Sequence, residues 1–378
     1  MNYFDFFIGN KVVNSVCLLS VFFVCIYNYN YLYSKENKGT GYFVLWLIFT
    51  LFSSFYSPSN GDTFTSLETY MSYQSGVSED LLHYEPIYFK IMDFIPYGYV
   101  VWRFTLWGCA ALLLTVYVRW MKFDIHVSTI ALLYFSLSLL YYQRAAVGYI
   151  LLYIALTLFV KYRDGDVQNL IGVRLLLLGG ICTLIALYFH TTMIVYAILM
   201  LLSVLVKPSK FVVISCICGC VIISLSIGNF TDWFLDNVAE ETQATADRYL
   251  SDATVGQSLN FFGVISWLVS NIPFYFMLFY CLWKVDADEF KFNRYEKAVL
   301  LNTGLLIVIS LIYSRVSSII QGKFYILSML PWGLFLSSYY TRCKENKVAR
   351  LFVKASLVSF VLGLAISLMT GTFISRIE

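Results

Sequence analysis

Residues 298–314, AVLLNTGLLIVISLIYS, run for 17 positions without a charged side chain. Lys297 precedes this stretch and Arg315 follows it. About 17–25 predominantly apolar residues are enough for a helix to cross the hydrocarbon core of a bilayer. The stretch therefore predicts a transmembrane helix with a basic residue at each of its two ends.

The whole chain has the composition of a membrane protein. Of its 378 residues, 59% are hydrophobic and 13% are charged, and the mean hydropathy is +0.72. Soluble domains carry about 25% charged residues, so this composition excludes a soluble globular enzyme. A net charge of +3 gives no reason to expect a nucleic-acid partner. We expect one all-α polytopic membrane domain over residues 1–378, with about twelve transmembrane helices. The apolar runs are centred near Leu19, Ile48, Leu112, Phe135, Leu152, Ile181, Ala197, Val221, Phe274, Leu306, Leu330 and Val361.

Two stretches, residues 58–97 and 229–260, are too polar to cross and are predicted to form large loops. Strict alternation of the spans puts both loops and both termini on one membrane face. The opposite face then holds 18 of the 26 Lys and Arg residues, and the positive-inside rule makes that face cytoplasmic. Both loops are expected to carry short helices. In the second loop, aromatic residues recur at helical spacing behind Thr231, which predicts an amphipathic helix at the outer interface.

Few basic residues remain on the outer face, and several of them lie where a helix meets the interface. These are Arg103, Arg144, Arg315 and Lys323, and His190 ends the sixth apolar run on the same side. Arg144 is expected in a two-residue connection between the fourth and fifth runs. Ionisable groups at membrane depth are costly and by default mark a functional cavity. Plainer interpretations stay open, because a terminal Arg can extend to lipid headgroups and a terminal His is commonly a satisfied interfacial residue.

The chain lacks the usual signatures of soluble enzymes. No Gly-rich phosphate loop, G-x-S-x-G, H-E-x-x-H or C-x-x-C pattern is present, which turns attention to a lipid-borne substrate. Arg guanidinium groups match phosphate oxygens with paired donors, and a carboxylate or imidazole can take a proton from a hydroxyl. Asp62 and Glu85 in the first loop are the candidate carboxylates, although Asp62 could equally cap a helix through Tyr70 and Tyr73. We expect no metal site and no cofactor.

Four short patterns occur in order along the chain. They are Gly61-Asp62 with Tyr70 and Tyr73 followed by Glu85-Pro86, then Gln143-Arg144-Ala145-Ala146, then Phe189-His190-Thr191-Thr192-Met193, and finally Arg315 ahead of Phe324-Tyr325 and Pro331. In this order the chain resembles the EpsG-like branch of the bacterial O-antigen and exopolysaccharide polymerases (Wzy). The resemblance covers roughly residues 40–205 and, more faintly, the eleventh span.

The resemblance implies a GT-C-like glycosyltransferase of the bacterial inner membrane, with its active site facing the periplasm. Its substrate would be an undecaprenyl-diphosphate-linked oligosaccharide repeat unit. The growing chain would move from its lipid carrier to the non-reducing end of a fresh repeat unit. Membrane lipids and a chain-length regulator protein are the further partners that such an enzyme implies.

The resemblance also suggests roles for the candidate residues. A lipid diphosphate is a good leaving group, so catalysis needs charge stabilisation on the diphosphate and a base for the acceptor hydroxyl. The cationic group is expected to be Arg144 and Arg315, assisted by Arg103 or Lys323. The candidates for the base are Asp62, Glu85 and His190, with Asp62 preferred. Tyr70 and Tyr73 are candidate platforms for sugar rings.

Other functions remain compatible with the sequence. They are a flippase or transporter of the same lipid-linked unit, an O-antigen ligase, a membrane acyltransferase and a structural membrane subunit. A transporter typically places ionisable residues near the bilayer midplane on broken helices, often in repeated halves. Here the ionisable residues gather at the outer ends of the spans, and no internal repeat is found.

Overall fold

The computed structural model describes most of the chain, and its regular secondary structure is helical. It describes residues 10–31, 40–55, 61–76, 86–95, 98–139, 143–165, 170–190, 192–216, 218–219, 222–223, 261–285, 290–313, 318–343 and 345–369. No strand occurs within these ranges. The helices are α1 (Lys11–Tyr31), α2 (Thr40–Phe55), α3 (Gly61–Gln74), α4 (Pro86–Phe94), α5 (Tyr99–Trp120), α6 (Ile125–Leu139), α7 (Gln143–Asp164), α8 (Leu170–Phe189), α9 (Met193–Leu205), α12 (Phe261–Trp283), α13 (Arg294–Tyr313), α14 (Ser318–Arg342) and α15 (Lys347–Met369).

The helices follow the apolar runs of the sequence. Eleven of the twelve predicted centres lie inside a helix, and the twelfth, Val221, is outside the described residues. Five helical stretches are long and apolar enough to cross a membrane, within α1, α5, α7, α8 and α13. The chain is thus a helical protein with several helices suited to a bilayer, and the number of twelve spans and the GT-C-like architecture stay predictions.

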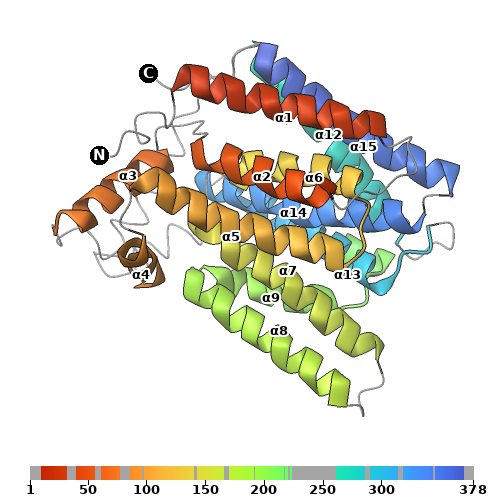
Figure 1. The fold of residues 1–378 in the computed structure, drawn as a ribbon. Coiled ribbons are helices and arrows are strands. Elements are labelled where there is room, and N and C mark those ends of the chain that lie inside the picture. The colour runs from red at the N-terminus through yellow and green to blue at the C-terminus, as the bar shows by residue number, and fades with distance from the viewer. Residues whose placement is uncertain are drawn as a thin grey trace.

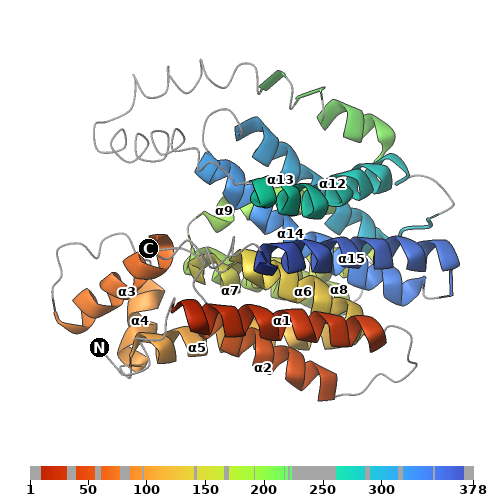
Figure 2. The ribbon, with the colours of Figure 1, turned by 90° about the horizontal axis from the view of Figure 1, so that it is seen from above.

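The long helices lie side by side and run back and forth between two ends of the molecule (Figures 1 and 2). One end carries α3 and α4, the start of α1 and the last residues of α15, and we call it the α3/α4 end. The opposite end carries connections rich in Lys and Arg, and we call it the basic end. Its described basic residues include Arg119, Arg163, Arg294 and Arg342.

Helix α7 lies in the centre, whereas α8 lies at the edge. α7 packs against α5, α8, α9 and α13. In α8, by contrast, Leu177 is 60% exposed and Leu184 is 67% exposed. Contiguous exposed apolar side chains on a helix long enough to cross a bilayer are expected to face lipid.

Polar side chains inside the bundle are joined to one another. The Tyr153 hydroxyl of α7 donates to Oδ1 of Asn302 in α13 (2.5 Å), and Nδ2 of Asn302 donates to Oγ of Ser203 in α9 (3.1 Å). Burying a polar group without a partner is costly, and these contacts satisfy one such group from each of three helices. They also fix the relative heights of α7, α9 and α13.

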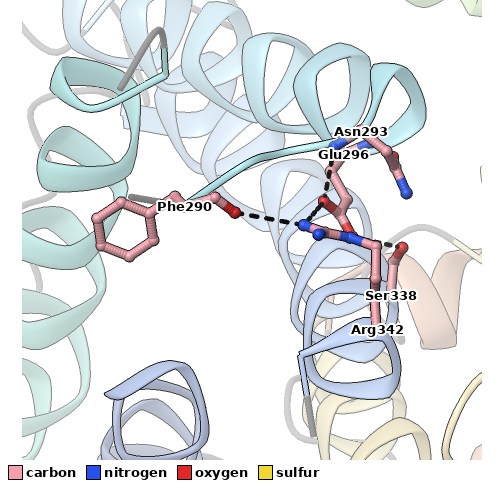
Figure 3. Close-up of polar contacts among 5 residues, drawn as sticks. All are labelled: Phe290, Asn293, Glu296, Ser338 and Arg342. Carbon is pink, nitrogen blue, oxygen red and sulfur yellow. Dashed lines mark hydrogen bonds and ion pairs between the residues drawn. The ribbon is translucent and has the colours of Figure 1, made fainter. Parts of the chain in front are cut away.

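At the basic end, Glu296 and Arg342 hold α13 to α14 (Figure 3). Asn293 and Glu296 form a capping box at the start of α13: the Glu296 N–H donates to Asn293 Oδ1 (2.8 Å), and the Asn293 N–H donates to Glu296 Oε2 (3.0 Å). Arg342 donates to both carboxylate oxygens, from Nε to Oε1 (3.0 Å) and from Nη2 to Oε2 (2.6 Å). Ser338 Oγ donates to Oε1 as well (3.1 Å). The Glu296 side chain is fully buried, and its carboxylate is satisfied by four hydrogen bonds, one from the Asn293 N–H, two from Arg342 and one from Ser338.

The predicted hairpin between the fourth and fifth apolar runs is wrong in its placement of Gln143 and Arg144. Gln143 and Arg144 do not form a connection between two short spans, because they are the first two residues of α7, a helix of 22 residues. A helix of that length is sufficient to cross a bilayer. The predicted amphipathic helix within residues 229–260 lies outside the described residues.

Candidate functional site

Arg103 lies in the first turns of α5 and is completely buried. Its Nη2 donates to the carbonyl oxygen of Ser53 in α2 (2.9 Å), and its guanidinium carbon lies 5.8 Å from the centre of the Tyr99 ring. A side chain that extends to lipid headgroups would be exposed. The burial therefore excludes that interpretation and leaves Arg103 as a cation held inside the protein at the α3/α4 end.

Aromatic rings cover the start of α5 from two sides. The Tyr99 and Trp102 rings are stacked with centroids 5.6 Å apart, and Tyr70 of α3 lies 5.8 Å from Tyr99. Tyr88 of α4 lies 6.3 Å from Trp102 and 6.4 Å from Phe189 at the end of α8. Helix α3 is thereby attached to α5, which carries Arg103, and α4 is attached both to α5 and to the end of α8, next to His190.

Tyr70 has a structural role that the sequence does not reveal. Its side chain is 4% exposed. The hydroxyl donates to the Ile95 carbonyl (3.2 Å) and accepts from the Gly98 N–H (3.1 Å). Gly98 has φ 116°, a value that side chains with a Cβ rarely adopt. Tyr70 thus fixes the turn into α5, and its burial leaves little of the ring for a sugar.

Tyr73, one turn further along α3, differs from Tyr70 because its side chain is half-buried. Its hydroxyl donates to Asp93 Oδ1 (2.7 Å), and its ring lies 4.8 Å from that of Phe89. The hydrogen bond to Asp93 raises the pKa of Tyr73, because the carboxylate stabilises the neutral phenol. Of the two tyrosines, Tyr73 is the better candidate for a sugar contact.

The contact between α5 and α7 sets the level of Arg144. The Tyr117 hydroxyl lies 2.6 Å from Thr157 Oγ1. Both helices run from the α3/α4 end toward the basic end. Arg103 and Gln143 each precede this contact by 14 residues, so they lie at similar heights. Arg144 is the next residue of α7, and its backbone is therefore level with Arg103.

The contact between α7 and α8 brings the His190 turn to the same level. A Cβ atom on Gly148 would lie only 3.0 Å from the Ala186 carbonyl oxygen and 3.3 Å from Met193 Cγ, so the helices approach closely here. The two helices are antiparallel. One turn toward the α3/α4 end from this contact leads to Arg144 on α7 and to His190 at the end of α8. His190 is half-buried, and its carbonyl accepts from the Met193 N–H (2.9 Å).

The contact between α7 and α14 adds Lys323. The Tyr149 hydroxyl donates to the Leu327 carbonyl (2.6 Å). Lys323 lies one turn before Leu327 and Ala145 one turn before Tyr149, so Lys323 is level with the start of α7. Its side chain is half-buried. Three independent contacts therefore place the backbones of Arg103, Arg144, His190 and Lys323 in one layer.

The remaining candidates are described in part or not at all. Asp62 lies in the first turn of α3, at the α3/α4 end, and a helix runs through Tyr70 and Tyr73 as predicted. The side chains of Asp62 and Arg144 lie outside the described residues, as do Glu85 and Arg315 entirely. Among the described side chains, no group of three or more His, Cys, Asp and Glu residues could hold a metal ion.

No protein-family model matches the chain, and comparison with curated proteins and with solved structures finds no match either. The layer that holds the backbones of Arg103, Arg144, His190 and Lys323 combines three residues of cationic type with one imidazole, and these residue types are able to bind an anionic group.

Several residues of this layer escaped prediction from the sequence. Tyr88, Tyr99 and Trp102 position the short helices, and Ser53 supplies the acceptor for Arg103. Aromatic residues make up 19% of the chain, so composition singles out none of them. In the sequence, Ser53 is distinguished only as a polar residue near the end of an apolar run, and this does not identify it as a partner of Arg103.

Proposed function

We propose that the chain is a membrane glycosyltransferase that polymerises undecaprenyl-diphosphate-linked oligosaccharide repeat units at the periplasmic face of the bacterial inner membrane. The observation that carries this proposal is the shared layer of Arg103, Arg144, His190 and Lys323 at the α3/α4 end. These residues are far apart in the sequence, and their common level is what binding of one lipid-linked head group requires.

In the proposed reaction, a hydroxyl oxygen of the acceptor sugar attacks the anomeric carbon of the donor chain. The bond between that carbon and the diphosphate oxygen breaks, and the diphosphate leaves with the electron pair. Arg144 and Arg315, with Arg103 or Lys323, stabilise the negative charge on the leaving group. The burial of Arg103 supports such a role, because electrostatic interactions are stronger where water is excluded.

The proton of the acceptor hydroxyl passes to a base. Asp62 is our preferred base, because it lies in the first turn of α3, which packs against α5 beside Arg103. His190 is the alternative, since an imidazole titrates near neutral pH and this residue lies in the same layer as Arg144. Glu85 is the third candidate.

The proposal is tested by replacing Arg144 with Ala in a host strain that lacks its own copy of the protein. Surface polysaccharide is then separated on a gel. We expect single repeat units in place of a ladder of long chains. Arg350, an exposed residue at the basic end, is the matched control, and Arg350→Ala should leave the ladder intact. A normal ladder from stable Arg144→Ala protein would contradict the proposal.

A transporter of the same lipid-linked unit is the second candidate, and one observation favours it. Helices α12 and α14 each contain an internal proline, Pro273 and Pro331. The two helices meet near these prolines, since Phe274 and Trp332 have ring centroids 5.4 Å apart. Interrupted helices are typical of transporters. The same gel separates the two functions, because loss of a transporter removes the single-unit band as well.

A further inference from the structure

Helix α14 contains a proline in its interior. Pro331 lies well inside Ser318–Arg342. Proline has no N–H group, so the carbonyl four residues earlier, that of Leu327, loses its usual helical donor. Leu327 is buried, with 2% of its surface exposed. In a protein surrounded by lipid, a freed backbone carbonyl must find another donor inside the structure.

Tyr149 of α7 supplies that donor. Its hydroxyl donates to the Leu327 carbonyl oxygen at 2.6 Å. Tyr149 is itself fully buried, and its ring packs edge-on against Tyr196, with centroids 5.6 Å apart. The hydroxyl of α7 thus replaces the N–H that the proline of α14 lacks, across 178 residues of sequence.

The segment of α14 that precedes Pro331 carries a candidate site residue. Lys323 lies one turn before Leu327, and the neighbouring Phe324 packs on Tyr196, with centroids 5.5 Å apart. A proline inside a helix bends it or lets it bend, so the direction of this segment depends on what holds it near Leu327. The Tyr149 hydroxyl is bound at that point.

We propose that Tyr149 is a positioning residue, which holds the first half of α14 in one direction about Pro331 and thereby places Lys323 beside the start of α7. The value of this placement for substrate binding rests on the proposed function. The hydrogen bond and its dependence on Pro331 do not rest on the proposed function, and both are tested without any substrate.

The test is a double-mutant cycle on the full-length protein purified in detergent. Tyr149→Phe removes the hydroxyl and leaves the Leu327 carbonyl without a donor, so the midpoint of thermal unfolding should fall by several degrees. Pro331→Ala restores a backbone N–H at the position that normally bonds Leu327. In that background Tyr149→Phe should cost less, because the Leu327 carbonyl keeps a donor and only the contact of the Tyr149 hydroxyl with that of Tyr153 (3.1 Å) is lost. Equal losses in both backgrounds would overturn the proposal.

Tyr117→Phe is the matched control. Tyr117 of α5 is as buried as Tyr149, and its hydroxyl bonds to the side chains of Thr157 and Tyr295 instead of to a carbonyl freed by proline. The loss of stability caused by Tyr117→Phe should be the same with and without Pro331→Ala. If Tyr149→Phe alone is too unstable to purify, recovery of the Tyr149→Phe/Pro331→Ala protein supports the proposal, and failure to recover it counts against it.

A second measurement reports position. A cysteine replacing Lys323 is labelled with a membrane-impermeant maleimide, and the labelling of the protein without this substitution is subtracted. Tyr149→Phe should change the labelling rate several-fold, whereas Tyr117→Phe should not. Unchanged labelling would contradict a positioning role for Tyr149, even if the effects of Tyr149→Phe and Pro331→Ala on stability are coupled. A normal polysaccharide ladder from Arg144→Ala would contradict the proposed function. It would not change what these measurements show about Tyr149.

Discussion

The two ends of the bundle use arginine in different ways. At the basic end, Arg342 is paired with the carboxylate of Glu296, and Arg294 with that of Asp164 (2.9 Å). At the α3/α4 end, the buried Arg103 is bound by a backbone carbonyl and an aromatic ring. A carboxylate compensates the charge of its arginine and fastens two elements. The carbonyl of Ser53 and the ring of Tyr99 orient the Arg103 side chain, and the carbonyl contact fastens α5 to α2.

The largest loss in the free energy of unfolding is expected at the basic end, for Glu296→Ala. Removal of one partner from a buried ion pair costs about 3–5 kcal/mol. The Arg342 side chain is 33% exposed and can find solvent, so we expect a loss of about 2–4 kcal/mol in the free energy of unfolding. Denaturant titration in detergent measures this loss. Glu345→Ala, at an exposed position of the same end, should have almost no effect, and equal effects of the two variants would contradict the assigned role.

The next effect concerns the contact that sets the level of Arg144 and His190. Gly148→Leu has no room for its side chain, since even a Cβ would lie 3.0 Å from the Ala186 carbonyl oxygen. Overpacking of this kind costs about 1–3 kcal/mol. Cross-linking of Arg144→Cys to His190→Cys with a short bismaleimide should fall sharply in this variant. Gly180→Leu on α8, where a Cβ meets no atom within 4 Å, should leave the cross-link intact. Persistence of the cross-link in Gly148→Leu would refute the register.

A smaller effect separates the two tyrosines of α3. Tyr70→Phe loses two buried hydrogen bonds and should lower the free energy of unfolding by about 1–2 kcal/mol. Tyr73→Phe loses one half-exposed bond, and its effect should stay within about 0.5 kcal/mol. Polysaccharide chain length should depend on the ring of Tyr73 and not on its hydroxyl. Tyr73→Ala is therefore expected to shorten the chains, whereas Tyr73→Phe is not. Normal chains from Tyr73→Ala would remove Tyr73 from the site.

The smallest effect is expected for Arg294→Ala at the basic end. Its ion pair with Asp164 is exposed, with side chains 37% and 51% accessible. Exposed pairs contribute about 0.2–1 kcal/mol and are screened by salt. The cost of the substitution should therefore disappear in high salt, whereas that of Glu296→Ala should persist. A loss as large as that of Glu296→Ala would show that exposure does not distinguish the two pairs.

The sequence predicts the helices well because hydropathy is a local property. The run centred at Leu306 is recognised without knowledge of any neighbour, and α13 contains it. Contacts between helices are not local. Nothing near Arg103 in the chain indicates that its acceptor is Ser53, 50 residues away. Tyr70 and Tyr73 are the same residue type within one helix, and only the packing of α4 and α5 distinguishes a buried structural tyrosine from an accessible one.

The contact between Arg103 and Ser53 also has a consequence for biogenesis. A ribosome makes α2 before α5, so the Ser53 carbonyl has already been synthesised when Arg103 leaves the ribosome. The guanidinium therefore has an acceptor as soon as α5 packs against α2, and an ionisable group without a partner would be costly at membrane depth. The Leu327 carbonyl, by contrast, is synthesised 178 residues after Tyr149, so their hydrogen bond forms later. The contact of Arg103 can thus form early in synthesis, and the proline-containing helix α14 can dock only near the end of synthesis.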